Sequence, residues 1–281
     1  MTMRMPRHAG LVAIATMVIA AVSSAPASVA PIALFTSAAN AAGIQSTVDS
    51  FRTALGTLNA NVAGSFGSGR REINWDGVPN TSAAPNLLPA NFFNTTSPRG
   101  AVFSTPGTGF EVSGNAGTAP IEFDDLNPTY DSQFAPFSPQ RIFTAIGSNT
   151  LDVTFFVPGS AVAALTRGFG AIFTDVDLAT TSSIQYFDAA NNSLGTFFVP
   201  SFLGNETLSF LGVIFDAPIV SRVRLTAGNQ ALGAGTTGDV VALDDFIFGE
   251  PAPVPEPATL GLLGMGVFTA LAARRRSRRT T

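Results

Sequence analysis

Acidic side chains are the main candidates for chemistry in this chain of 281 residues. Three pairs of aspartates stand close together in the sequence: Asp124 and Asp125, Asp175 and Asp177, and Asp244 and Asp245. Side chains two residues apart in a strand point to the same side, so Asp175 and Asp177 are spaced to meet at one cation. Carboxylate oxygens are the ligands that Ca²⁺ prefers, and paired carboxylates also hydrolyse glycosides. The alternative for every pair is a set of solvated carboxylates at strand ends and in loops.

The residue types that are missing narrow the chemistry further. The chain has no cysteine and no lysine, and its one histidine is His8, close to the N-terminus. If the N-terminal segment is removed, no imidazole, thiol or amine side chain remains. This excludes histidine-based serine or cysteine triads, lysine Schiff bases, and the histidine or cysteine ligand sets that are usual for zinc. Facing carboxylates are then the one catalytic option left, and we expect a protein that is not an enzyme.

Charge is strongly segregated along the chain. Residues 43–250 hold eighteen acidic residues against eight arginines, a net charge of −10. The two ends are basic, with Arg4 and Arg7 at the front and five arginines at the back: Arg274, Arg275, Arg276, Arg278 and Arg279. An acidic body argues against binding of nucleic acid, whereas basic ends beside apolar runs indicate contact with a membrane.

The N-terminal segment has the order of parts that is typical of a secretory signal peptide. Two arginines and a histidine precede an apolar run from Ala9 to Val22, and small residues follow. The run is shorter than the ~20 apolar residues that a spanning helix needs. We therefore expect residues 1–42 to be a signal peptide that enters the Sec export machinery. The cleavage position stays open: Ala39-Asn40-Ala41 has suitable small residues but lies far from the apolar run, while sites near residues 25 and 30 put proline next.

A helix and a glycine-rich stretch follow this segment. Residues 43–62 carry apolar side chains at helical spacing, which predicts an amphipathic helix that packs on the body: Ile44, Val48, Phe51, Leu55 and Leu58. Residues 64–72 are rich in glycine but lack the residues of a phosphate-binding loop, so we expect a flexible loop there.

Residues 63–250 as a whole carry the pattern of an all-β domain. Short runs rich in Phe, Val, Ile and Thr alternate with turn signals, and no fixed repeat is present. In one run Val223 and Leu225 share one face, while Arg222, Arg224 and Thr226 share the other. We expect an antiparallel β-sandwich of about ten strands, similar to a jelly roll, that positions the aspartates.

A proline-rich linker and one short apolar run close the chain. Residues 251–259 hold four prolines, which make an extended, semi-rigid spacer. Leu260–Ala273 is apolar without interruption and would span only about 21 Å at ~1.5 Å per residue, against the ~30 Å of a hydrocarbon core. We expect residues 260–281 to be a single transmembrane helix of marginal length with a basic tail, whose arginines stop it on the cytoplasmic side.

The order of these C-terminal parts resembles the PEP-CTERM sorting signal of exported proteins in Gram-negative bacteria. Pro255-Glu256-Pro257 is similar to the motif that names this family, and the apolar run and the basic end follow it in the family's order. The resemblance covers only the C-terminal end of the chain. It implies processing by an exosortase, a membrane protease that would recognise Glu256 and its flanking prolines. The mature protein would then be released to, or attached at, the cell surface, and the family often occurs in bacteria that produce exopolysaccharide.

One run in the body carries a second resemblance. Residues 240–248, VVALDDFIF, are similar to the last strand of MAM-type and carbohydrate-binding jelly rolls. In those folds an acid of the last strand helps to bind structural Ca²⁺, which the resemblance transfers to Asp244 or Asp245. The resulting hypothesis is an exported, non-enzymatic surface or matrix protein that binds polysaccharide. The alternatives are a secreted glycan-active hydrolase and a purely structural surface protein.

Overall fold

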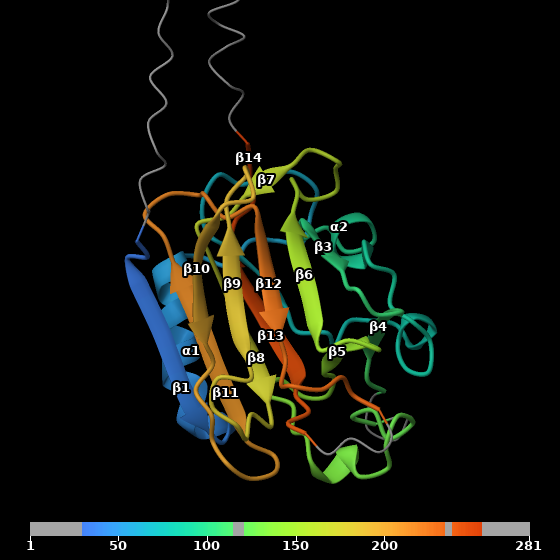
Figure 1. The fold of residues 1–281 in the computed structure, drawn as a ribbon. Helices are drawn as coiled ribbons and strands as arrows, with labels where there is room; N and C mark the ends of the chain where they lie inside the picture. Colours follow the sequence, from blue (N-terminus) through green and yellow to red (C-terminus); the bar gives the residue numbers. More distant parts are fainter. Residues whose placement is uncertain (1–29, 115–120, 234–237, 255–281) are drawn as a thin grey trace, which may run out of the picture.

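Two stacked antiparallel sheets form the body of the protein in the computed structural model (Figure 1). The structure describes residues 30–114, 121–233 and 238–254. The larger sheet runs in the order β1-β11-β8-β13-β5-β4, and β2 also pairs with β13. Its strands are β1 (Ala33–Ala39), β2 (Arg70–Ile73), β4 (Gly109–Val112), β5 (Phe143–Ile146), β8 (Gly168–Thr174), β11 (Leu208–Ile214) and β13 (Ala242–Gly249). The expected antiparallel β architecture is confirmed.

The smaller sheet has the order β10-β9-β12-β6-β3. Its strands are β3 (Ala101–Ser104), β6 (Thr150–Phe155), β9 (Ser183–Phe187), β10 (Ser193–Phe198) and β12 (Arg222–Thr226). The other elements of the described chain are the ribbon of β7 (Ala164–Leu165) and β14 (Ala252–Pro253), helices α1 (Ala41–Leu55) and α2 (Phe92–Thr95), and the 3₁₀ turns η1 (Asn80–Ser82) and η2 (Tyr130–Ser132). No helix in the described ranges is long and apolar enough to cross a membrane. The span expected at residues 260–281 lies outside them.

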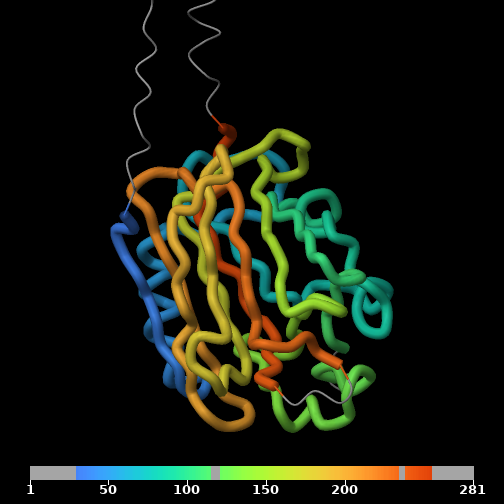
Figure 2. Tube along the Cα trace, viewed as in Figure 1, coloured from blue at the N-terminus to red at the C-terminus, as the bar shows by residue number. Residues whose placement is uncertain are grey.

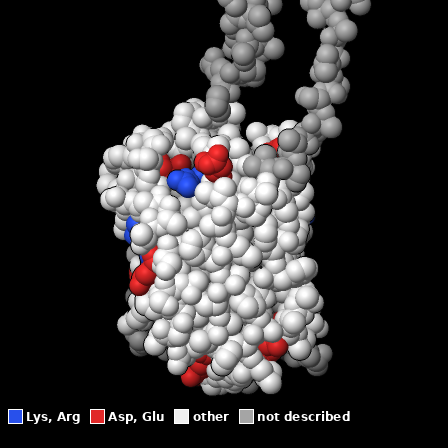
Figure 3. Space-filling view, turned by 90° about the vertical axis from the view of Figure 1, so that its left-hand side faces the viewer, with Lys and Arg blue, Asp and Glu red and all other residues white. Residues whose placement is uncertain are grey.

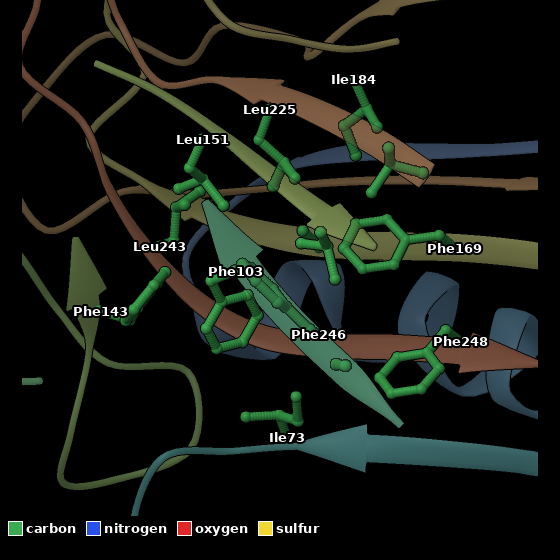
Figure 4. Close-up of a cluster of buried hydrophobic side chains, with 14 of the residues drawn as sticks. Ile73, Phe103, Phe143, Leu151, Phe169, Ile184, Leu225, Leu243, Phe246 and Phe248 are labelled. Carbon is green, nitrogen blue, oxygen red and sulfur yellow. The ribbon is translucent and has the colours of Figure 1, made fainter. Parts of the chain in front are cut away.

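Apolar side chains, many of them aromatic, fill the space between the two sheets (Figure 4). Every second residue of a strand faces inward, so the Phe-rich runs bring rings from β3, β5, β8 and β13 into one core. The indole of Trp75 stacks on the ring of Phe143 with centroids 4.1 Å apart, and Phe246 meets the indole edge-on at 5.1 Å. Trp75, Tyr130 and Tyr186 are each at most 1% exposed. None of these three side chains is therefore an open platform for a sugar ring.

Helix α1 covers the outer face of the larger sheet, where it contacts β1, β11 and β13. Asn40 caps its N-terminus, since the side-chain Oδ1 accepts a hydrogen bond from the Gly43 amide at 2.9 Å. Its buried side chains are those that helical spacing predicts: Ile44, Val48, Phe51 and Leu55. The helix ends at Leu55 and not at residue 62, because Gly56 takes a left-handed φ of 106° there and its amide closes the last turn.

Strand β1 lies within residues 1–42, the segment in which the sequence pattern predicts a signal peptide. It pairs with β11 along all seven of its residues, and the Ile32 amide donates to the Ile214 carbonyl at 2.9 Å. A cut at Ala39-Asn40-Ala41 would remove this strand from the sheet, so a leader that ends at residue 42 conflicts with the fold. Small residues favour both a cleavage region and this edge strand, so the sequence pattern alone leaves the boundary open. The signal peptide itself stays a prediction.

The two ends of the described chain lie at the same end of the sandwich (Figure 2). The β7–β14 ribbon lies at that end as well (Figure 1). The loops that follow β8 and β10 lie at the opposite end (Figure 1). Asp175 and Asp177, which come directly after β8, are thus far from both ends of the described chain.

Candidate functional site

Asp244 and Asp245 lie on β13 at a β-bulge. The register of β13 against β8 shifts at these two residues, and a bulge re-aims side chains that would otherwise alternate between faces. Both carboxylates therefore reach the same loop. Asp244 Oδ2 accepts hydrogen bonds from the amides of Phe137 at 2.5 Å and Ser138 at 3.1 Å, and Asp245 Oδ1 accepts from Ser138 Oγ at 2.7 Å.

The same pair is tied to helix α1 and kept from water. Arg52 Nη2 donates to Asp245 Oδ2 at 3.0 Å and to Glu72 Oε2 at 2.9 Å. Burial, and then the charge of Asp245, raises the pKa of Asp244 well above its usual range, and burial raises the pKa of Asp245 to about 6. Oδ1 of Asp244 has no hydrogen-bond partner in the described chain. The pair joins a loop and a helix to the sheet.

Asp175 and Asp177 lie in the loop after β8, in a separate acidic group. Asp175 has a left-handed φ of 69° and is 1% exposed. Its Oδ2 accepts from Gln133 Nε2 at 2.5 Å, and its Oδ1 has no partner in the described residues. Burial raises the pKa of Asp175 to about 7, and the charges of Asp177 and Asp239 act in the same direction. Asp177 Oδ1 accepts from the Gly204 amide at 2.8 Å, so this acid holds loop backbone.

The structure does not bring the two predicted metal-binding pairs together. Asp244 and Asp245 are on β13, whereas Asp175 and Asp177 follow β8. Within residues 30–114, 121–233 and 238–254, no three histidine or acidic side chains form a group that could hold a metal ion. The unpaired oxygens of Asp244 and Asp175 would be single ligands in different places. Structural Ca²⁺ at either pair stays a prediction.

Asp124 and Asp125 lie in a turn beside β4, where Asp125 meets another carboxyl group. Asp125 shares a hydrogen bond with Glu111, and burial, followed by the charge of Asp125, raises the pKa of Glu111 to about 7. The catalytic carboxyls of glycosidases stand ~5–9.5 Å apart so that a sugar and water fit between them. Glu111 is only 4% exposed and touches Asp125 directly. This pair therefore lacks the room that glycoside hydrolysis needs.

The outer face of the smaller sheet is open and carries polar side chains. In Figure 1 this face is turned toward the viewer, with no described helix over β9, β12 and β6. Val223 and Leu225 are buried while Arg222, Arg224 and Thr226 face outward, as the sequence alternation predicts. The strand registers align one outward residue from each of the five strands, and we call this set the polar row: Ser104, Asp152, Arg224, Gln185 and Thr196.

A cluster of charges stands at the centre of the polar row. Arg224 Nε and Nη2 donate to the two carboxylate oxygens of Asp152 at 2.7 and 3.0 Å, a bidentate ion pair. Arg222 Nη1 lies 3.0 Å from Asp152 Oδ2. The Arg222 guanidinium also lies over the Phe187 ring, 3.7 Å from its centroid. Two arginines share one carboxylate, so the cluster keeps an excess of positive charge.

The polar row opens into a groove of about 430 Å³ beside the edge strand β3. Its lining combines apolar surface with hydroxyl groups and the ion pair: Ser104, Thr105, Pro106, Thr150, Leu151, Asp152 and Arg224. The volume is within the ~300–1,000 Å³ of typical ligand sites. The side chain of Arg224 is 46% exposed. At the other edge of the same face the ring of Phe198 is 54% exposed.

Two other surfaces offer less for a ligand. A hollow of about 510 Å³ lies beside Gly56, Gly69 and Glu250. Glu250 is engaged there by Nε and Nη2 of Arg71 at 2.7 and 2.9 Å and by Nδ2 of Asn59 at 2.8 Å, so it holds a loop in place. The side of the sandwich that carries β1 has few charged side chains (Figure 3). The polar row combines exposure, charge and a cavity.

A match to a protein-family model identifies the sorting signal of the chain. The model of the PEP-CTERM protein-sorting motif matches residues 253–276. The chain carries a PEP-CTERM sorting signal. The matched segment contains Pro255, Glu256 and Pro257 and the first three of the five C-terminal arginines. The PEP-CTERM motif implies an exported surface protein and processing by an exosortase. The motif and all five arginines lie outside the described residues.

Other comparisons assign no family to the body of the chain. No curated protein matches the chain. A glycoside hydrolase family 43 arabinoxylan arabinofuranohydrolase from Bacillus subtilis is 18% identical with a TM-score of 0.27, over 54% of this chain and 27% of the enzyme. A family 29 carbohydrate-binding module from Piromyces equi is 12% identical with a TM-score of 0.24, over 53% of this chain and 90% of the module. Scores this low assign neither a fold nor a ligand.

Of the polar row, the sequence pattern predicts only the outward position of Arg224. The alternation in β12 shows that Arg222 and Arg224 share a face, but their partner Asp152 is about seventy residues earlier in the chain. A signal was present in β6, where Asp152 is the one charged side chain in the alternating run TLDVTF. Which strand lies beside which is set by the sheet topology and not by local pattern.

Proposed function

We propose that this PEP-CTERM protein is an exported, non-enzymatic protein of the cell surface or extracellular space that binds polysaccharide along the polar row. The observation that carries the proposal is an uncovered sheet face on which charged, amide and hydroxyl side chains line up across five strands. The body is then a jelly-roll-like sandwich that presents this face as its binding surface.

The chemistry of the polar row suits a polymer of sugars. Sugar hydroxyls both donate and accept hydrogen bonds, and the row supplies an acceptor in Asp152, donors in Arg224, and both in Gln185. The ion pair fixes Arg224 and Asp152 before a ligand arrives, which reduces the entropy lost on binding. Five strands at ~4.8 Å spacing extend roughly 19 Å, a length that favours an extended chain over a small molecule. The exposed ring of Phe198 offers an apolar surface for one sugar face.

The same residues favour binding over hydrolysis. The groove holds one carboxylate, Asp152, which two arginines neutralise. Glycoside hydrolysis generally uses two carboxyl groups, one of them protonated near neutral pH. Glu111 and Asp125 are two such groups elsewhere, but they contact each other and leave no space for a substrate.

Sorting places this surface outside the cell. We infer that the Sec machinery exports the chain and that residues 260–281 cross the inner membrane transiently, with the arginines from Arg274 to Arg279 on the cytoplasmic side. An exosortase would then act at Pro255-Glu256-Pro257.

Affinity electrophoresis of the full-length chain through gels that contain different polysaccharides tests the proposal. We expect at least one polymer to retard the chain, and the double variant Gln185→Ala/Phe198→Ala to weaken that binding roughly tenfold, since about 1.4 kcal/mol of contact is lost. Leu87→Ala removes another half-exposed apolar side chain, away from the polar row, and is the matched control.

Two results would overturn the proposal in different ways. Absence of retardation by every polymer would favour a purely structural protein. Release of reducing sugar that disappears in Asp152→Asn would favour the hydrolase.

A further inference from the structure

Arg224 has one edge of its guanidinium in use and one edge open. The edge formed by Nε and Nη2 is occupied by Asp152, at 2.7 and 3.0 Å. Nη1 makes no hydrogen bond with the described residues, and the side chain is 46% exposed at the groove. The second edge, formed by Nη1 and Nη2, therefore offers two parallel N–H groups to a ligand. A guanidinium edge of this geometry pairs with a carboxylate through two hydrogen bonds.

The surroundings hold this open edge in place. Asp152 is fixed between Arg224 and Arg222, and the Arg222 guanidinium is in turn packed over the ring of Phe187 at 3.7 Å. Ser104 and Thr150 line the groove beside it. A carboxylate that binds to Arg224 thus meets a preformed donor with hydroxyl groups nearby, and little side-chain entropy is lost.

Local charge on this face differs in sign from the charge of the body. The outward residues of the five strands include two arginines and one acid, whereas residues 43–250 together carry eight arginines and eighteen acids. Asp188, the acid directly after β9, accepts hydrogen bonds from the Ala190 and Asn192 amides of its own turn. Charges more than ~8–10 Å away are screened at physiological ionic strength, and the facing sheet lies ~10 Å behind. An anionic ligand therefore meets the positive cluster first.

We propose that the polar row recognises a polysaccharide that carries carboxylate groups, with the open edge of Arg224 pairing with the carboxylate of a uronic acid residue. This inference rests on the proposed polysaccharide binding and adds the class of polymer. The hydroxyls of Ser104 and Thr150 contact the same sugar or its neighbour. Neutral polymers lack the group that fills the open edge.

Two polymers that share the same sugar backbone and differ only in charge distinguish this inference from the proposed polysaccharide binding. Affinity electrophoresis or calorimetry compares the full-length chain on polygalacturonate and on the same polymer after full methyl esterification, which masks every carboxylate. We expect binding to polygalacturonate to be at least about tenfold tighter. Arg224→Gln abolishes this preference, and Arg224→Lys restores part of it, because the charge returns without the planar edge. Arg167→Gln makes the same change in net charge at the other hollow and is expected to keep the preference.

Each of the remaining outcomes is decisive. Equal binding of both polymers by the unmodified chain would overturn the inference and leave polysaccharide binding in place. Equal losses in Arg224→Gln and Arg167→Gln would overturn it as well, because only net charge would then matter. Failure to bind these or any other polymers would remove the proposed function itself. Far-UV circular dichroism checks that every variant is folded.

Discussion

Seven carboxyl groups of the described chain have pKa values that burial raises, and four of them rise close to neutrality. Burial is the largest cause in each case, and it raises the pKa of Asp175, Glu111 and Glu122 to about 7 and that of Asp245 to about 6. Unfolded aspartate and glutamate have pKa values of roughly 4. Between pH ~4 and ~7 the folded chain therefore binds more protons than the unfolded chain.

The free energy of unfolding is therefore expected to fall as the pH rises from about 5 to about 8. A carboxyl group with a raised pKa stabilises the folded state while it is protonated, and this contribution is lost when the pH passes its pKa in the folded chain. Asp175→Asn removes one titrating group while its amide oxygen still accepts from Gln133. This variant is expected to flatten the fall between pH 5 and 8, whereas Asp49→Asn removes an exposed carboxyl group on α1 and is the control. Urea midpoints at both pH values measure the change. A midpoint that rises with pH would contradict this account.

At the residue scale, spacing predicts candidates but not their surroundings. Asp175 and Asp177 are spaced to share one side of a strand, yet β8 ends at Thr174, so the alternation does not reach them. Residues 64–72 have the composition of a flexible loop. Arg71 within them is nevertheless fully buried and pairs with Glu250, which is 179 residues away in the sequence. Partners so distant along the chain are fixed only by the assembled sheets.

At the element scale, the position of α1 depends on two glycines of the sheet beneath it. The ring of Phe51 rests on β8 and β11 where Gly170 and Gly212 face the helix. A Cβ atom at Gly212 would lie 2.7 Å from Phe51 Cε2, and one at Gly170 would lie 2.8 Å from Cε1. Phe210 also packs edge-on against Phe51, with centroids 5.3 Å apart. The ring of Phe35 lies edge-on to Phe51 as well, with centroids 5.4 Å apart.

Gly212→Ala is therefore expected to lower the free energy of unfolding by about 1–3 kcal/mol, the usual cost of overpacking a close-packed interior. Gly77→Ala is the control, because an added Cβ atom there meets no other atom within 4 Å. Chemical denaturation of both variants gives the comparison. Equal midpoints for the two variants would show that α1 shifts without cost and that the glycines do not set its position.

Elements with strong periodicity were predictable, and those defined by pairing alone were not. The helical spacing of Ile44, Val48 and Phe51 gives α1, and alternation gives β6 and β12. Strand β1 is composed mainly of small residues and is a strand because β11 lies beside it. The bulge on β13 that turns Asp244 and Asp245 toward one loop has no local sequence signal either.

At the scale of the whole molecule, the arrangement of ends and faces agrees with a sorted surface protein. Both ends of the described chain lie at one end of the sandwich, and the open sheet face runs along its side (Figures 1 and 2). A chain held at the membrane through its C-terminal segment would thus keep the polar row clear of the bilayer. Release by an exosortase would leave the same face free in solution.

The intact mass of the mature protein from its native host tests both ends at once. Because β1 pairs along its whole length, we expect signal cleavage upstream of Ile32, and Ala25-Pro26-Ala27 supplies small residues with Ser28 next. Because the PEP-CTERM signal matches residues 253–276, we expect the apolar run and the arginines to be absent. Glu256→Ala is expected to retain them, while Asp216→Asn, an exposed change within the body, is processed normally. An N-terminus at residue 40 or beyond would contradict the role of β1, and a retained tail in the unmodified chain would contradict exosortase processing.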